Sequence, residues 1–432
     1  MFFFRVGPNE YSEGLCANYS RHIIQIAVQN VLKYRKIVVT SIIFTFFPLK
    51  IRKCFVKLEQ GKFSKYRILS IISYFCGFYT KGDIMKKSLQ MGSAFIGIIV
   101  GAGFASGQEI LQYFTSFGSM GLIAALVSTV LFAYLGMNLT RLGSRLQTTS
   151  HKEVVYGISG KFFGRIVDYI IIFTLFGVGA VMLAGAGSVF SQQFGLPSIL
   201  GSTVMAVIVI LTIMLNVQKV IAIIGGVTPF LVLAIVLIAI YSIATMGLSY
   251  SEMNTLAKAQ PTTLPNWFIS SINYVSFNIA VGASMSVVMG GTEGDEKIAA
   301  RGGLIGGLGL GILIILSHLT IFSKIDLVAG YEMPMLKMVD DIHPVLGVFM
   351  SLILFGMIFN TAVGMFFSFS ARFVEMGTKK FKIFVIATVT IAYLASFVGF
   401  TDLVSMFYPV VGYLGLFLVG AIVYASFKHK SN

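Results

Sequence analysis

The sequence predicts an all-α, polytopic membrane protein with ten transmembrane helices, arranged as two inverted repeats of five in which helices 1 and 6 are broken. Composition predicts the class, because 56% of the 432 residues are apolar and only 11% are charged, whereas soluble domains are about 25% charged. Glycines and polar residues interrupt the first and sixth apolar segments. Backbone at that depth in a membrane needs a cavity, a ligand or an ion to satisfy it.

Residues 1–84 differ from the rest of the chain. They hold 13 of the 32 lysines and arginines and all three cysteines, and their apolar runs are shorter than the roughly 20 residues that span a bilayer. The codons for Lys81 to Met85 can contain a bacterial ribosome-binding sequence just before an ATG. We predict that the protein made in the cell begins at Met85 and that 1–84 is translated upstream sequence; a basic cytoplasmic leader is the alternative. The ten-helix transmembrane domain is then 85–432.

Hydropathy and its breaks place ten spans of helix length after Met85. They run at about 88–117, 119–140, 166–192, 198–215, 220–247, 265–290, 302–322, 344–371, 383–399 and 402–427. The repeats then cover about 88–247 and 265–427.

The positive charges between these spans test the assignment. Sixteen lysines and arginines fall on one side of the membrane, and only Lys258, Lys324 and Lys337 fall on the other. By the positive-inside rule both termini are cytoplasmic, and the protein lies in the bacterial inner, or plasma, membrane. The net charge of +15 is therefore a topology signal and does not indicate nucleic-acid binding; the partner is the lipid bilayer.

The first span carries the most informative interruption, at Gly101 to Glu109. Ser106 and Glu109 have the spacing of a capping box, so a half-helix is expected to begin there with its amides facing the gap, while carbonyls freed around Gly101 to Gly103 offer oxygen ligands. We predict a substrate site at Gly101, Ala102, Gly103, Ser106, Gly107 and Glu109. The alternatives are that the glycines only pack against other helices and that Glu109 only caps.

The sixth span contains the second interruption, from Asn273 to Ser284. The amide of Asn278 can both donate and accept hydrogen bonds, so it could bind a substrate amine or carboxylate, or bridge two helices. Ser276 is a weaker candidate because a serine is easily satisfied within its own helix. Both are added to the predicted substrate site.

The eighth span places Asn360 and Thr361 about midway along its length. Carbonyl and hydroxyl oxygens suit a hard cation, so Gly101, Glu109, Asn360 and Thr361 form the predicted coupling-ion site. Hydrogen bonding between helices is the alternative. Asp168 is expected near the cytoplasmic end of the third span as an interfacial or gate residue, and His318 is expected at an interface.

The remaining motifs give no sign of an enzyme. Glycines from Gly302 to Gly311 open the seventh span at the spacing of close helix packing, and they are not a phosphate loop. No His/Cys/Asp/Glu cluster has metal spacing, and no nucleophile comes with a base. The sequence predicts no catalytic residue, no metal and no cofactor beyond a coupling Na⁺ or H⁺, and it identifies no protein partner.

The run from Ala94 to Glu109, with Tyr274 to Asn278, resembles the bacterial membrane proteins called YkvI. The resemblance covers essentially Met85 to Asn432. That family is similar to a branch of the amino acid, polyamine and organocation transporter superfamily with the LeuT-type fold. It implies a cation-coupled carrier of amino acids or similar small solutes, with its site between helices 1 and 6.

Glu109 departs from the LeuT-type pattern, in which the amides of the broken first helix receive the substrate carboxylate. We hypothesise that Glu109 is protonated when substrate is bound, or that it pairs with a cationic substrate or with Na⁺. The sequence thus predicts a small-molecule symporter that works by alternating access. A non-transporting nutrient sensor with the same fold is the alternative, and a channel is a third possibility.

Overall fold

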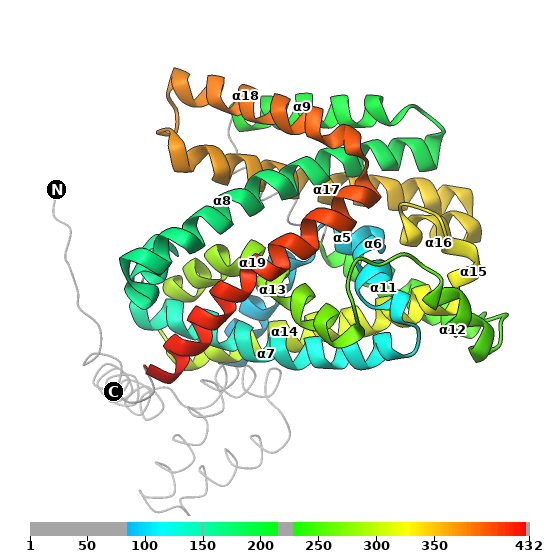
Figure 1. Ribbon diagram of the computed structural model, residues 1–432, viewed down its shortest axis with the longest axis horizontal. Coiled ribbons are helices and arrows are strands. Elements are labelled where there is room, and N and C mark those ends of the chain that lie inside the picture. The colour runs from blue at the N-terminus through cyan, green and yellow to red at the C-terminus, as the bar shows by residue number, and fades with distance from the viewer. Residues whose placement is uncertain (1–83, 148–150, 215–227, 429–432) are drawn as a thin grey trace, which may run out of the picture. The chain divides into compact units, whose positions relative to one another are not determined.

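The computed structural model describes residues 84–147, 151–214 and 228–428 of the chain (Figure 1). They belong to one compact unit, Lys81–Asn432, and their regular structure is helical, with no strand among them. Apart from residue 84, the predicted leader lies outside the described residues, so its assignment stays a prediction.

A helix lies at each of the ten predicted spans. The first span is broken into 84–99, α5 (Ala102–Ser106) and α6 (Gln108–Tyr113), followed by the 3-10 turn η1 (Thr115–Phe117). The others, in chain order, are α7 (Met120–Leu146), α8 (His151–Phe194), α9 (Ser198–Met214), α11 (Thr228–Ala244), α13 (Trp267–Thr292), α14 (Glu296–Ser323), α17 (Pro344–Phe373), α18 (Lys379–Ala395) and α19 (Phe400–Lys428). Short helices α12 (Tyr250–Lys258), α15 (Ile325–Val328) and α16 (Pro334–Ile342) connect them, and η3 (Ser396–Val398) follows α18.

The helices have the lengths and apolarity that a polytopic membrane protein requires. Within the described ranges, six are long and apolar enough to cross a membrane, and α13 makes a seventh when its two bent halves count as one span. The helices α9 and α11 are shorter apolar helices. Together with the broken first helix, these account for the predicted spans.

The predicted interruption of the sixth span is a bend in α13. The halves Trp267–Ala283 and Met285–Thr292 meet at 55°, at the end of the polar run in which the break was expected. Asn278 therefore lies inside a continuous helical stretch, before the bend.

The glycines of α14 confirm the predicted close packing, and they do so on two sides. Gly302, Gly306 and Gly309 face Met91, Phe95 and Ile96 of the first helix, while Gly303, Gly307 and Gly311 face Gly136, Phe132 and Thr129 of α7. On a helix, residues four apart share a face and adjacent residues are about 100° apart. Two interleaved rows of glycine thus bring two helices close to α14 at once.

The packing joins corresponding helices of the two predicted repeats. The helix α7 packs on α14, α8 packs on α17, and α9 packs on α18. In the predicted numbering these are helices 2 and 7, 3 and 8, and 4 and 9. Nothing tests the inverted relation of the repeats beyond this pairing, so it stays a prediction.

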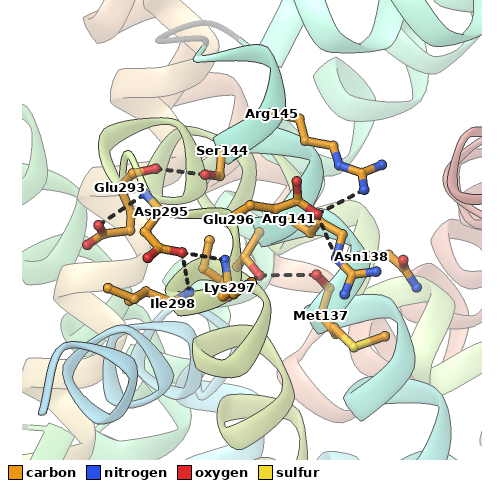
Figure 2. A network of polar contacts seen from close by, with 12 residues as sticks. Met137, Asn138, Arg141, Ser144, Arg145, Glu293, Asp295, Glu296, Lys297 and Ile298 are labelled. Atoms are coloured by element: carbon orange, nitrogen blue, oxygen red, sulfur yellow. Dashed lines mark hydrogen bonds and ion pairs between the residues drawn. The ribbon is translucent and has the colours of Figure 1, made fainter. Parts of the chain in front are cut away.

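A polar network holds the turn between α13 and α14 against the end of α7 (Figure 2). Glu296 lies 3.4 Å from Arg141 Nε and 2.9 Å from Arg145 Nη2, and Ser144 Oγ donates to the Glu293 carbonyl at 2.8 Å. Asp295 caps α14 by accepting from two of its amides. Because the pairs are partly exposed, each contributes little stability by itself, and the network mainly fixes the turn's position.

The segment between α14 and α17 is tied down on the opposite end of the helices. Gln192 of α8 donates to the Met333 carbonyl and accepts from the Met333 amide, both at 3.0 Å. Met335, at the start of α16, packs on Gly107, where an added Cβ would lie 2.9 Å from Met335 Cγ. The loop between the seventh and eighth spans thus reaches the bend of the first helix.

Candidate site at the broken first helix

The first helix breaks at Val100 and Gly101. Gly101 has an extended backbone, and Ala105 N–H donates to its carbonyl at 3.0 Å. Among the residues that the structure describes, no backbone amide bonds to the carbonyls of Ile98 and Ile99. Helix termini leave such carbonyls for another partner, and here that partner must be supplied within the protein interior.

The free carbonyls of Ile98 and Ile99 lie before the positions predicted for them, Gly101 to Gly103. The carbonyl of Gly101 is taken by Ala105, and that of Gly103 accepts a hydrogen bond from Ser106 Oγ at 2.8 Å. The expectation of free carbonyls at Gly101 to Gly103 is therefore wrong, because α5 begins immediately after Gly101 and uses them.

The predicted capping box is also wrong. Ser106 ends α5 instead of capping α6, and Gly107, in the left-handed conformation with φ 85°, separates the two helices. Ser106 Oγ still accepts from the Gln108 amide at 3.2 Å, but Glu109 does not reach back to the Ser106 amide. Its Oε2 accepts a hydrogen bond from the Tyr274 hydroxyl at 3.2 Å.

The Glu109 side chain folds back over α5 into a buried position. The residue is 5% exposed, and a Cβ added at Gly103 would overlap Glu109 Oε1 and lie 2.8 Å from its carboxyl carbon. Gly103 is thus needed for the space it leaves, and any side chain there would displace the carboxyl group. Of the predicted residues, Gly103, Ser106, Gly107 and Glu109 are brought together here.

Aromatic residues enclose the carboxyl group. Tyr274 lies on α13 with its ring 5.1 Å from that of Tyr113 and 5.0 Å from that of Phe114. Tyr408 of α19 is buried within electrostatic range of Glu109 and stacks on Phe277 at 4.1 Å. The site therefore draws its walls from helices α6, α13 and α19.

A second polar chain links the same three helices. Tyr113 OH donates to Asn273 Oδ1 at 3.2 Å, and Asn273 Nδ2 donates to the Pro409 carbonyl at 2.9 Å. Pro409 lies inside α19 and has no amide to give to the Ser405 carbonyl, which accepts from Thr263 Oγ1 at 2.7 Å instead. These bonds connect α19 to Asn273 of α13 and to Thr263 in the segment before α13.

Sequence reasoning missed Tyr274, Tyr113 and Asn273 as parts of the site. The signal available was Glu109 itself, since a carboxyl group inside a membrane protein needs a donor or counterion close by. Nothing in the local sequence indicates which of the many aromatic residues supplies it.

The two predicted residues of α13 make contacts mainly at their own helix or at α19. Asn278 Nδ2 donates to the Tyr274 carbonyl one turn earlier at 3.0 Å. Ser276 Oγ is buried without a hydrogen-bond partner among the described residues and lies against Gly415 of α19. Asn278 is thus one turn from the residue that bonds Glu109, and Ser276 faces the neighbouring helix.

Thr361 and Gly101 of the predicted ion site are neighbours. A Cβ added at Gly101 would lie 3.7 Å from Thr361 Oγ1 and 4.0 Å from the Ile99 carbonyl oxygen. The Glu109 carboxyl group lies against Gly103 instead. Asn360, half-buried, is adjacent to Thr361 on α17. Among the described residues, the contacts bring Gly101 and Thr361 together, and none joins Glu109 or Asn360 to them.

Two other predicted polar residues have structural partners. Asp168 of α8 pairs with Arg372 of α17 at 2.6 Å, which joins α8 to the end of α17. His318 is 1% exposed and not interfacial as expected, because its Nδ1 is bonded to Thr115 Oγ1 at 3.1 Å. In the described part of the chain no group of three or more His, Cys, Asp or Glu could hold a metal ion.

Two solved structures share this architecture. The crystal structure of MhsT in complex with L-phenylalanine covers 78% of this chain and 87% of its own, with a TM-score of 0.58 and 16% sequence identity. The inward-facing conformation of Mhp1 matches 76% of this chain and 73% of the Mhp1 chain, with a TM-score of 0.53 and 13% sequence identity. This chain is therefore a polytopic α-helical membrane protein with the LeuT fold.

The sequence is also similar to two bacterial proteins, YkvI and YyaD. It is 29% identical over 334 residues to the uncharacterized membrane protein YkvI of Bacillus subtilis (strain 168). The match covers 77% of this chain and 94% of YkvI. It is 28% identical over 331 residues to the uncharacterized protein YyaD of the same organism. That match covers 75% of this chain and 92% of YyaD. No family model matches the sequence. The resemblance stated from the sequence is confirmed.

Proposed function

We propose that this protein is a secondary active transporter that carries an amino acid or related small solute by cation-coupled symport, through alternating access, in the bacterial cell membrane with both termini in the cytoplasm. The observation that carries the proposal is the broken first helix, with free carbonyls before the break and a buried carboxyl group after it. Secondary transporters with broken helices bind substrate and coupling ion at such places.

One place for a coupling cation lies between Gly101 and α17. The Ile99 carbonyl and Thr361 Oγ1 both flank Gly101, and Thr361 Oγ1 has no hydrogen-bond partner among the described side chains and backbone. Carbonyl and hydroxyl oxygens without protein donors are the ligand type that hard cations take. Asn360, beside Thr361, is the remaining candidate ligand on this helix. Whether Na⁺ or H⁺ is used here is left to experiment.

The proposed solute site is at the same break, between the backbone of the first helix and the side chains of α13. Gly101, Ala102, Gly103, Ser106 and Gly107 supply backbone, and Ser276 has a buried hydroxyl without a partner. Asn278 lies one turn from Tyr274. MhsT was solved with L-phenylalanine, and this supports testing amino acids first.

Thermal unfolding of the full chain in detergent tests the proposal. We would measure the midpoint with each of the twenty proteinogenic L-amino acids and with simple amines, with and without Na⁺. A ligand at about 100 times its Kd that binds only the folded state adds about 2.7 kcal/mol. Stabilisation by one solute class, followed by uptake into proteoliposomes, supports the transporter. Binding without uptake would favour the nutrient sensor, and no stabilisation by any probe would count against an amino acid substrate.

We expect Thr361→Val to abolish any stabilisation by Na⁺. The substitution keeps the shape of the side chain but removes the hydroxyl that lies on Gly101. The matched control is Thr388→Val in α18, since Thr388 Oγ1 bonds only the Phe384 carbonyl of its own helix, at 2.8 Å. Thermal unfolding over a Na⁺ series compares the two. The ion site at Gly101 is refuted if Na⁺ stabilises Thr361→Val as much as it stabilises the unaltered protein. It is also refuted if Na⁺ stabilises neither Thr361→Val nor the unaltered protein.

A further inference from the structure

Glu109 has no positively charged partner in the described part of the chain. The structure describes four ion pairs, and none includes Glu109. Among the same residues, its one hydrogen bond is the 3.2 Å bond from Tyr274 OH. An unpaired carboxylate inside a membrane protein costs several kcal/mol, so some cation must accompany this group or its charge must be removed.

Among the described residues, the elements around Glu109 supply no basic side chain that could pair with its carboxylate. The titratable groups that face it are Tyr113 of α6, Tyr274 of α13 and Tyr408 of α19. His318 of α14 is bonded to Thr115. The basic residues of α16 and α17 have acidic partners of their own, Lys337 with Asp341 and Arg372 with Asp168.

The space around the carboxyl group decides which cation fits. Glu109 is 5% exposed, and Tyr113, Tyr274 and Tyr408 are each at most 1% exposed. Oε1 lies against the Gly103 Cα, in the position a Cβ would take. A hard metal cation needs several oxygen ligands, whereas only the Tyr274 hydroxyl reaches the carboxyl group. An organic ammonium would need more room still.

We propose that Glu109 is a proton-binding residue that is neutral in this conformation, and that its proton is the coupling ion at this face of α5. The role in coupling rests on the proposed transport function. The transfer is a simple ionisation: the O–H bond of the carboxylic acid breaks, the electron pair stays on the carboxylate, and water takes the proton when the site opens. The Gly101–Thr361 place involves other residues than this step.

The hydrogen bond from Tyr274 and the space over Gly103 make these two residues positioning residues. Tyr274 OH holds Oε2, and the missing side chain at Gly103 lets the carboxyl group fold against α5. Neither residue touches a reacting group other than Glu109.

Infrared spectroscopy of the purified full chain in detergent tests the proposal without any substrate. The ordinary pKa of a glutamate in water is about 4.3, so exposed carboxyl groups are ionised at pH 7.5. We expect the unaltered protein to show a protonated-carboxyl C=O band at pH 7.5 that is lost in Glu109→Gln. The band should persist in Glu375→Gln, which alters an exposed residue between α17 and α18.

A second variant covers the case in which Glu109→Gln does not fold. Tyr274→Phe removes the donor to Oε2 and should shift the frequency of the same band. Absence of the band at pH 7.5, or a band that neither variant changes, overturns the proposal. Because the readout needs no transported solute, a failed ligand panel leaves this result standing, and a successful panel with no carboxyl band rejects Glu109 as the proton carrier while keeping the transporter.

Discussion

Gly307→Leu is expected to lower the thermal unfolding midpoint by about 3 °C. A Cβ at this position would meet the backbone of Phe132 and Ala133 in α7, and backbone cannot move aside as a flexible side chain can. Overpacking typically costs about 1–3 kcal/mol, and we place this case near 3 because α7 and α14 would have to separate. An unfolding entropy of about 2.1 cal/mol/K per residue corresponds to about 1 °C per kcal/mol for a chain of this size, and the shift is measurable by fluorescence-detected unfolding in detergent.

Gly420→Leu is the matched control. Gly420 lies in α19, is exposed, and has nothing within 4 Å of an added Cβ. The same change of residue should therefore leave the midpoint within about 0.5 °C, since exposed substitutions usually stay within about 0.5 kcal/mol. Equal shifts in the two variants would contradict the contact between α14 and α7.

Asn273→Ala is expected to destabilise the protein by about 2 kcal/mol, with a fall in midpoint of about 2 °C. The substitution leaves the buried Tyr113 hydroxyl without its acceptor and takes the side-chain donor from the Pro409 carbonyl. A buried polar group left unsatisfied costs about 1–3 kcal/mol, and the average interhelical hydrogen bond in membranes is worth about 0.6.

Asn278→Ala gives the comparison within the same helix. Asn278 is also almost completely buried, but its amide donates to the Tyr274 carbonyl of its own helix, so its removal should cost less than about 1 kcal/mol. Thermal unfolding of both variants, without added solute, measures the difference. If Asn278→Ala is as destabilising as Asn273→Ala, the link between α6, α13 and α19 is not what stabilises this region.

The spans could be predicted from the sequence because burial in lipid leaves a strong signal. Each of the ten spans is a run of apolar residues that ends at charges or turns, and each has its helix in the structure. The glycine rows of α14 were predicted for the same reason, since small residues four apart have few uses in a membrane helix other than close packing. The break of the first helix followed from the run of glycines at Gly101 to Gly107.

Local motifs within the break could not be interpreted from the sequence with equal success. The pattern Ser-x-x-Glu occurs twice wholly within the described residues, at Ser106 to Glu109 and at Ser249 to Glu252. Only the second forms a capping box, at the start of the exposed helix α12, where hydrogen bonds from Ser249 also lower the pKa of Glu252. At the first, Gly107 turns the chain before α6 begins, and Tyr274, which is distant in sequence, takes the carboxyl group.

The contact between Gly101 and Thr361 could be predicted from the sequence only in part. The oxygen chemistry of Thr361 was visible in the sequence, but its place on Gly101 depends on the packing of α17 against α5. The same packing leaves Asn360 without a contact at the break. Adjacent residues on a helix point about 100° apart, so the sequence could name the pair but not which of the two faces the break.

The three faces of α14 fix its angular register. Its two glycine rows face the first helix and α7, and Leu304, Leu308 and Ile312 form a third row that is exposed. A one-residue insertion just before Gly302 would rotate these faces by about 100° relative to the preceding part of α14. If that preceding part stayed in place, leucine and isoleucine would turn into spaces that hold no side chain. The helix should therefore tolerate many apolar exchanges along its exposed row and almost no change in length.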